Sequence, residues 1–311
     1  MVYIIQFSLG LIFEIQAIAI SIIIFLYFLQ NPRIRLKRHH YSWLTLLTLN
    51  FFKLISDLPI ALNFYYQEKL WPESYIFCTL WAWLDFSLSC ATLYLTVWIS
   101  VERHLIIFHS PTLFEGRWQK WIFRIVPIII CLIVPPILYF NLIVIPPQCT
   151  NIWDFRTLLC GPPCYSFTGF YGIFDFIFNI CAPLLITIFV NLMLIIRVIK
   201  GKVSRQQAIE WRHHRKMILQ FSAITVLQLA FSSPLVTVSF IQMTVMPSFM
   251  ADQYSTLEYI FYYMPLLLPA TCLCGIPELV KKIYGFICNR RTTTVTAGNI
   301  PSARQKPANR F

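Results

Sequence analysis

The chain has 311 residues, of which 58% are hydrophobic and only 12% are charged. A soluble domain carries about a quarter charged residues, so this composition excludes an ordinary soluble protein. The formal net charge of +12 is not a sign of nucleic-acid binding in a chain this apolar. Composition therefore predicts a membrane protein.

Seven apolar runs follow one another along the chain, each long enough for a bilayer-spanning helix of about 20 residues. They do not alternate apolar and polar residues, as the strands of a membrane barrel would. The sequence therefore predicts an all-α membrane protein, a seven-transmembrane helix bundle. The expected spans are 3–29, 42–66, 75–107, 121–145, 167–199, 213–245 and 255–276.

Basic residues set the expected orientation, because Lys and Arg concentrate in cytoplasmic loops. Three basic clusters fall on one side, so the N-terminus is expected outside and the C-terminus in the cytoplasm, in a multi-pass plasma-membrane protein. Contact with lipid headgroups is the simplest role for these charges. The clusters are Arg33, Arg35, Lys37 and Arg38; Arg197, Lys200, Lys202, Arg205, Arg212, Arg215 and Lys216; and Lys281, Lys282, Arg290, Arg291, Arg304, Lys306 and Arg310.

Four cysteines fall on the expected outer side, where disulfides persist. They are Cys78, Cys149, Cys160 and Cys164. Four cysteines allow three connectivities, and spacing alone does not choose among them. The loop of about 146–166 is rich in Pro and Cys, and once tied by disulfides it would lie over the bundle as a lid.

The segment after the seventh span predicts a surface helix over 277–288. Proline and glutamate open this segment and are good helix starters. Its apolar residues form one stripe, typical of a helix lying on the inner membrane surface. Cys288 at its end is either a palmitoylation site or an unmodified thiol. We expect one membrane domain over 1–288, with a disordered cytoplasmic tail over 289–311.

The third span carries a charged triplet, Glu102-Arg103-His104, at its inner end, and Cys78 opens the same span 25 residues before Arg103. A charged pair at a membrane helix end is costly unless it has a role or a partner. This combination resembles the rhodopsin-like G-protein-coupled receptors, especially divergent invertebrate members, in which the triplet is usually Asp-Arg-Tyr. The resemblance covers nearly the whole chain.

The resemblance implies a function and partners. Such a receptor transmits an extracellular ligand's signal to a heterotrimeric G protein, with arrestin and membrane lipids as further partners and with no cofactor. Glu102, Arg103 and His104 would form the G-protein coupling site. The resemblance also favours a disulfide from Cys78 to the 149–164 loop, and it matches 277–288 to the family's eighth helix.

The resemblance also implies an activation core. Asp57 would stand in the place of the family's buried sodium-binding aspartate, and Thr92 would supply a hydroxyl beside it. Lys53 lies one turn before Asp57 on the same helix face. It would either pair with Asp57 and replace the sodium, or extend towards the inner interface.

Three helix prolines match the family, whereas the side chains near them depart from it. Pro183, Pro234 and Pro269 are retained in the fifth, sixth and seventh spans. Asn191, Ser232 and His214 replace the expected tyrosine, the switch tryptophan and the acidic partner of the coupling arginine. The loss of the acidic partner predicts a weak resting lock and measurable basal signalling.

The expected outer half carries eight acidic residues against two basic ones, Lys69 and Arg156, which should attract a cationic ligand. Asp85 and Asp175 lie within spans, where unpaired carboxylates are costly, so both are candidate ligand anchors. The alternative is that each is a helix-end carboxylate with a polar neighbour. We expect a basic peptide, with an amine as the alternative ligand. The eight acids are Glu14, Glu68, Glu73, Asp85, Asp154, Asp175, Asp252 and Glu258.

Other functions fit the sequence less well. All six histidines fall at cytoplasmic helix ends and no His-Glu-x-x-His occurs, which argues against a membrane metallohydrolase and against an enzyme in general. A seven-span transporter or light-driven pump is a remote alternative, because the seventh span contains no lysine. The nearest rival is a receptor-like protein whose signalling is weak or constitutive.

Overall fold

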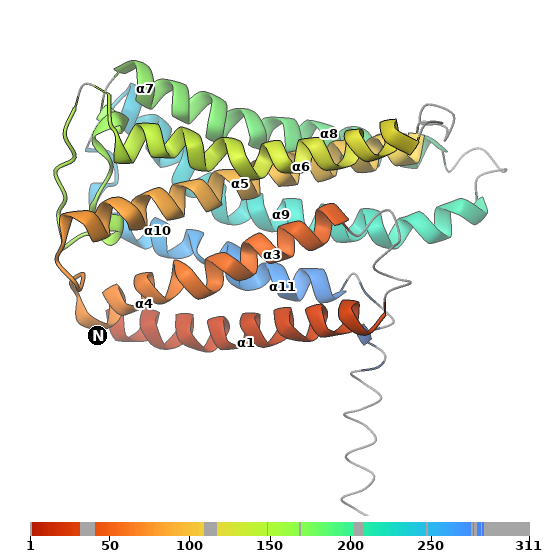
Figure 1. Cartoon of the computed structure of the whole chain (residues 1–311), viewed down its shortest axis with the longest axis horizontal. Coiled ribbons are helices and arrows are strands. Elements are labelled where there is room, and N and C mark those ends of the chain that lie inside the picture. Colours follow the sequence, from red (N-terminus) through yellow and green to blue (C-terminus); the bar gives the residue numbers. More distant parts are fainter. Residues whose placement is uncertain are drawn as a thin grey trace, which may run out of the picture. The chain divides into compact units, whose positions relative to one another are not determined.

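The computed structural model describes residues 2–31, 41–108, 117–147, 149–167, 169–201, 208–246 and 248–274, with 276, 279–280 and 282. Residues 1–275 form one compact unit, a bundle of long helices running side by side (Figure 1). Within the described residues, seven helical segments are long and apolar enough to cross a membrane. The predicted seven-helix fold is confirmed.

The observed spans match the expected ones closely. The sixth is given from Ser222, the first residue of its helix whose side chain the structure describes, although the helix itself begins at Ala208. The seven spans are Tyr3–Gln30, Tyr41–Gln67, Tyr75–Leu105, Ile125–Val144, Gly169–Arg197, Ser222–Thr244 and Tyr254–Cys274. The helices that build them are α1 (Val2–Gln30), α3 (Tyr41–Ser56), α4 (Leu58–Gln67), α5 (Tyr75–Phe108), α6 (Arg117–Tyr139), α7 (Gly169–Phe174), α8 (Ala182–Gly201), α9 (Ala208–Thr244), α10 (Tyr254–Phe261) and α11 (Tyr263–Cys274).

The bundle turns apolar side chains outward and polar ones inward. Ile15, Leu185 and Val226 are each more than half exposed, as lipid-facing side chains must be. Serines, threonines, asparagines and several charged residues are instead buried between helices. In a bilayer this arrangement is stable because polar groups find partners only inside the bundle.

Four spans contain interruptions that the sequence analysis did not predict, and one of them is the seventh, which breaks at Tyr262 between α10 and α11. The second span breaks at Asp57 between α3 and α4, because Pro59 has no amide hydrogen to continue the helical ladder. The fourth span ends in a π-helical turn, η2 (Phe140–Val144), and the fifth contains another, η5 (Asp175–Cys181). Such turns rotate the following side chains and often occur at functional sites.

The connection between the fourth and fifth spans folds over one end of the bundle, the same end at which α1 begins (Figure 1). Two disulfides hold this lid, Cys78–Cys160 and Cys149–Cys164. The first attaches the lid to α5, as the resemblance favoured, and selects Cys160 among the three loop cysteines. The second closes the lid on itself.

Packing fixes the lid as well. Leu158 and Cys160 are buried against residues of α4, α5 and α10. Tyr165 is fully buried beside Tyr139 and Leu142. At the start of the fifth span, Gly172 allows close approach, because a Cβ there would lie 2.5 Å from the Ser166 carbonyl oxygen.

Residues 276–311 form a second unit. Within it, Leu279, Val280 and Lys282 are helical. The predicted surface helix over 277–288 otherwise lies outside the described residues, as do Cys288 and the tail over 289–311. The expected boundary at 288 lies outside the described residues and stays a prediction.

Candidate functional site

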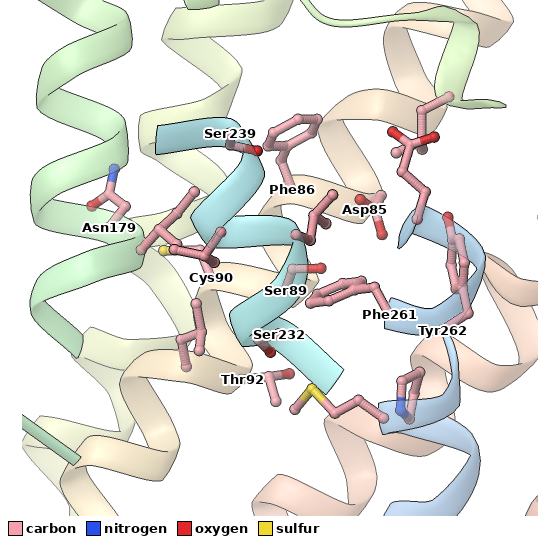
Figure 2. Close-up of a pocket in the computed structure, with 18 of the residues that line it drawn as sticks. Asp85, Phe86, Ser89, Cys90, Thr92, Asn179, Ser232, Ser239, Phe261 and Tyr262 are labelled. Carbon is pink, nitrogen blue, oxygen red and sulfur yellow. The ribbon is translucent and has the colours of Figure 1, made fainter. Parts of the chain in front are cut away.

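A cavity of about 200 Å³ lies inside the bundle, lined by residues from α3, α5, α9, α10, α11 and the fifth span. Leu159 of the lid also lines it. Figure 2 shows Asp85 beside Phe261 and Tyr262, with Asn179 on the opposite side and Thr92 and Ser232 nearer one end. The cavity is therefore mainly apolar and aromatic, with polar groups at separate places on its wall.

Lys53 is the centre of the polar part of the cavity. Its Nζ donates to Asp85 Oδ1 at 2.5 Å and to Ser89 Oγ at 2.7 Å. The same atom lies 3.3 Å from Asp57 Oδ2. The predicted pair of Lys53 with Asp57 is present, but it is one side of a three-residue ion cluster that joins the second and third spans.

Two aromatic rings complete the surroundings of the Lys53 ammonium. The ring centroids of Phe261 and Tyr262 lie 5.9 Å and 5.8 Å from Nζ. Ring faces at this distance attract a cation. Lys53 thus points into the cavity from the second span, and the alternative that it extends to the inner interface is wrong.

Asp57, which the resemblance assigned to the activation core, contacts Trp81 as well as Lys53. Its Oδ1 accepts a hydrogen bond from Trp81 Nε1 at 2.7 Å, and the side chain is fully buried next to Lys53. Thr92 does not join it: its hydroxyl donates to the Leu88 carbonyl of its own helix. The contact between Lys53 and Asp57 agrees with the expectation that Lys53 pairs with Asp57 in place of a sodium ion, and the roles of Asp57 and Thr92 in an activation core stay predictions.

The buried polar residue that ties the second span to the seventh is Asn50, which the sequence analysis missed. Its Nδ2 donates to the Pro265 carbonyl oxygen at 2.9 Å. Pro265 lies four residues before Pro269, and Pro269 and Pro234 both lie inside helices, as expected. In the sequence, nothing distinguished Asn50 from Asn63, the other amide of the same span.

Asp85 and Glu258 are the carboxylates that line the cavity. Asp85 is held by Lys53, whereas no donor among the described residues bonds to Glu258. The charges of the two carboxylates interact across the cavity. Glu258 was one of the eight outer acids in the sequence, but nothing in the pattern distinguished it from the others.

Asp175 does not line the described cavity wall. Its Oδ1 accepts hydrogen bonds from Tyr139 OH and Asn179 Nδ2, each at 2.7 Å, and its Oδ2 accepts one from Tyr165 OH at 3.0 Å. The side chain is buried, with three donors from the fourth span, the fifth span and the lid. This geometry favours the alternative in which Asp175 is a carboxylate with polar neighbours, and its role as a ligand anchor stays a prediction.

Tyr165 joins this carboxylate to the lid and lies outside the membrane spans. Burial, followed by the nearby charge of Asp175, raises the pKa of Tyr165 well above its usual value. The hydroxyl therefore stays protonated and remains a donor across the physiological pH range.

Two buried charges lie at the C-terminal end of the third span, which is the end expected to face the cytoplasm. Glu102 Oε2 accepts a hydrogen bond from Ser42 Oγ at 2.6 Å, and its charge interacts with that of Arg103. Arg103 is only 3% exposed, and His104 is partly exposed. The His214 side chain lies outside the described residues, so the weak resting lock expected there stays a prediction.

A buried amide connects three spans near this end. Asn191 Nδ2 donates to Thr225 Oγ1 at 2.8 Å and to Ser100 Oγ at 3.2 Å. These contacts join α8 to α9 and to α5 one turn before Arg103. Asn191 stands where the resemblance expected a tyrosine, and it supplies an interhelical contact of its own.

Comparison with protein families identifies the chain. Residues 21–281 match the model of the 7 transmembrane receptor (rhodopsin family), so the protein belongs to this family. It is a multi-pass membrane receptor, a class that is not enzymatic and that in general couples an extracellular ligand to a G protein. A search of curated proteins finds no match to the sequence.

Proposed function

We propose that this receptor binds a ligand with a cationic group in the cavity beneath the lid and passes the signal to a heterotrimeric G protein at the inner end. The observation that supports this most directly is the charge around the cavity. Two carboxylates, Asp85 and Glu258, line the cavity together with the Lys53 ammonium, and Lys53 also contacts a third carboxylate, Asp57. The excess negative charge favours a cation and opposes an anion.

The cavity also limits the size of the group it accepts. A cavity of about 150 Å³ holds a benzene molecule, so the volume of about 200 Å³ suits one aromatic amine or one peptide side chain. A basic peptide would place a single cationic side chain here and rest the remainder on the lid. The same volume gives a small amine as the second candidate.

The coupling role belongs to Arg103 with Glu102 and His104 beside it. Arg103 would contact the G protein when the inner half of the sixth span moves outward. The orientation that this requires, with the N-terminus and the lid outside, agrees with the basic clusters expected on the cytoplasmic side. Arrestin would use the same inner surface.

The experiment is second-messenger output in transfected cells exposed to panels of cationic peptides and of small amines, with neutral analogues as controls. We expect a cationic activator and basal output that Arg103→Ala abolishes. Surface labelling checks that this variant reaches the plasma membrane. If it does so and signals unchanged, Arg103 does not couple. An activator that is neutral or anionic contradicts the ligand class.

A further inference from the structure

We infer that Lys53 is a resident ammonium that occupies Asp85, so that the ligand's cationic group is received by Glu258. The inference rests on the proposed function, since it names the residue within that cavity that makes the contact. It reverses the expectation from the sequence, in which Asp85 and Asp175 were the two anchors.

The first step is that the site around Lys53 is already complete. Its ammonium has three donors, and it contacts Asp85, Ser89 and Asp57. Two aromatic rings lie on its remaining side. A second ammonium at Asp85 would have to displace a lysine anchored in the same helix as Asp57, and it would meet like-charge repulsion in a low-dielectric site.

The second step is that Glu258 is a carboxylate without a counter-ion. It lines the cavity from α10, one turn before Phe261 and Tyr262, and no donor in the described part of the chain bonds to it. The Tyr254 side chain lines the cavity on the same helix. An arriving cation would gain a charge-assisted hydrogen bond and aromatic contact there without displacing any group of the protein.

The third step is the charge balance. With Lys53 holding Asp57 and Asp85, and with Glu258 added, the cluster is left with an excess of negative charge. One monovalent cation at Glu258 would relieve the repulsion between Glu258 and Asp85. The class of ligand is therefore one with a single ammonium or guanidinium group close to an apolar or aromatic body, matching the cavity wall.

The test uses the full-length receptor purified into lipid nanodiscs, with benzylamine as the probe and benzyl alcohol as its neutral control. Dissociation constants come from the change of melting temperature with probe concentration. We expect benzylamine to bind more tightly than benzyl alcohol. Glu258→Gln should weaken benzylamine by at least roughly tenfold, whereas Asp85→Asn should change it by less than about threefold.

A double variant separates the two carboxylates. Lys53→Met with Asp57→Asn removes the resident ammonium and one of its carboxylates, and leaves Asp85 open to the cavity. This receptor should bind benzylamine roughly tenfold more tightly than the parent, and Glu258→Gln should then weaken binding much less. Because one positive and one negative charge are removed together, its folding should suffer less than that of Lys53→Met alone.

The outcomes distinguish the inference from the function on which it rests. If benzylamine binds equally to the parent and to Glu258→Gln but is lost in Asp85→Asn, the assignment of Glu258 is overturned. The proposal that the receptor binds a cationic ligand would still hold. Equal binding of benzylamine and benzyl alcohol to the parent overturns the cationic ligand itself. Absence of benzylamine binding to the parent also overturns Glu258 as an open anchor, while the signalling assay still tests the receptor.

Discussion

Two buried carboxylate sites near the lid end of the bundle differ in how their charge is balanced. Asp85 is paired with the Lys53 ammonium and lines a cavity. Asp175 is held by three neutral donors, Tyr139, Asn179 and Tyr165, and joins the lid to two spans. The same residue type therefore belongs to a charged, ligand-accessible cluster in one place and to a closed structural network in the other.

The difference shows why a buried aspartate in a membrane helix is not by itself a ligand site. A carboxylate that already accepts three hydrogen bonds has about one of its four acceptor positions left for a ligand. A carboxylate paired with a lysine has its charge neutralised. The net charge of the cavity then depends on the other acidic residues that line it. The following predictions test this contrast, in order of decreasing effect on stability.

The largest effect is expected from Lys53→Met. Removing the ammonium leaves Asp57 and Asp85 buried without their counter-ion, which should lower the free energy of unfolding by about 3–5 kcal/mol. The measurements are the melting temperature of purified receptor and its surface expression. The matched control is Lys53→Met with Asp57→Asn and Asp85→Asn, which should recover most of the loss. Equal instability of the control would contradict the ion cluster as the cause.

A smaller effect is expected from Asp175→Leu, which leaves the hydroxyls of Tyr139 and Tyr165 and the amide of Asn179 without their acceptor. The loss should be about 1–3 kcal/mol. Asp175→Asn is the control, because its amide still accepts from two of these donors and offers hydrogen to the Tyr165 oxygen. Asp175→Asn should change the benzylamine dissociation constant by less than about twofold relative to the parent. A tenfold weakening would instead show that Asp175 contacts the ligand.

The smallest effect is expected from Tyr165→Phe, which removes only the lid's hydrogen bond to Asp175 and should cost about 0.5–1.5 kcal/mol. Amide hydrogen exchange in residues 149–167 should rise while the bundle stays protected. Unchanged exchange in this lid segment would show that the disulfides and apolar packing hold it without this hydrogen bond.

The same contact has a defined pH dependence. Because the pKa of Tyr165 is raised in the folded receptor, its contribution is fully present below the unfolded value of about 10 and is lost only as pH rises through the higher folded value. The difference in protection between the parent and Tyr165→Phe should therefore be constant from pH 6 to pH 9. A decline of that difference within this range would contradict the raised pKa.

The sequence by itself determined the features that depend on composition and local pattern. Runs of apolar residues long enough for a bilayer predict the spans within a few residues for six of the seven, because hydrophobic length is a local property. The paired positions of Cys78 and Arg103 in one span indicated the family, which the match over 21–281 confirms. The prediction that Cys78 forms a disulfide with the 149–164 loop also came from this resemblance.

Only the tertiary structure decided which polar side chains meet. The break at Asp57 before Pro59 and the π-helical turn at Asp175–Cys181 alter where the nearby side chains lie, and no apolar pattern records such changes. The folded bundle brings Lys53 to Asp85, places Asp57 beside Trp81 and encloses Asp175 among its three donors. A charged residue in a span indicates that a partner exists, because burying a charge without a partner is too costly. The sequence does not identify that partner, because it lies on another helix.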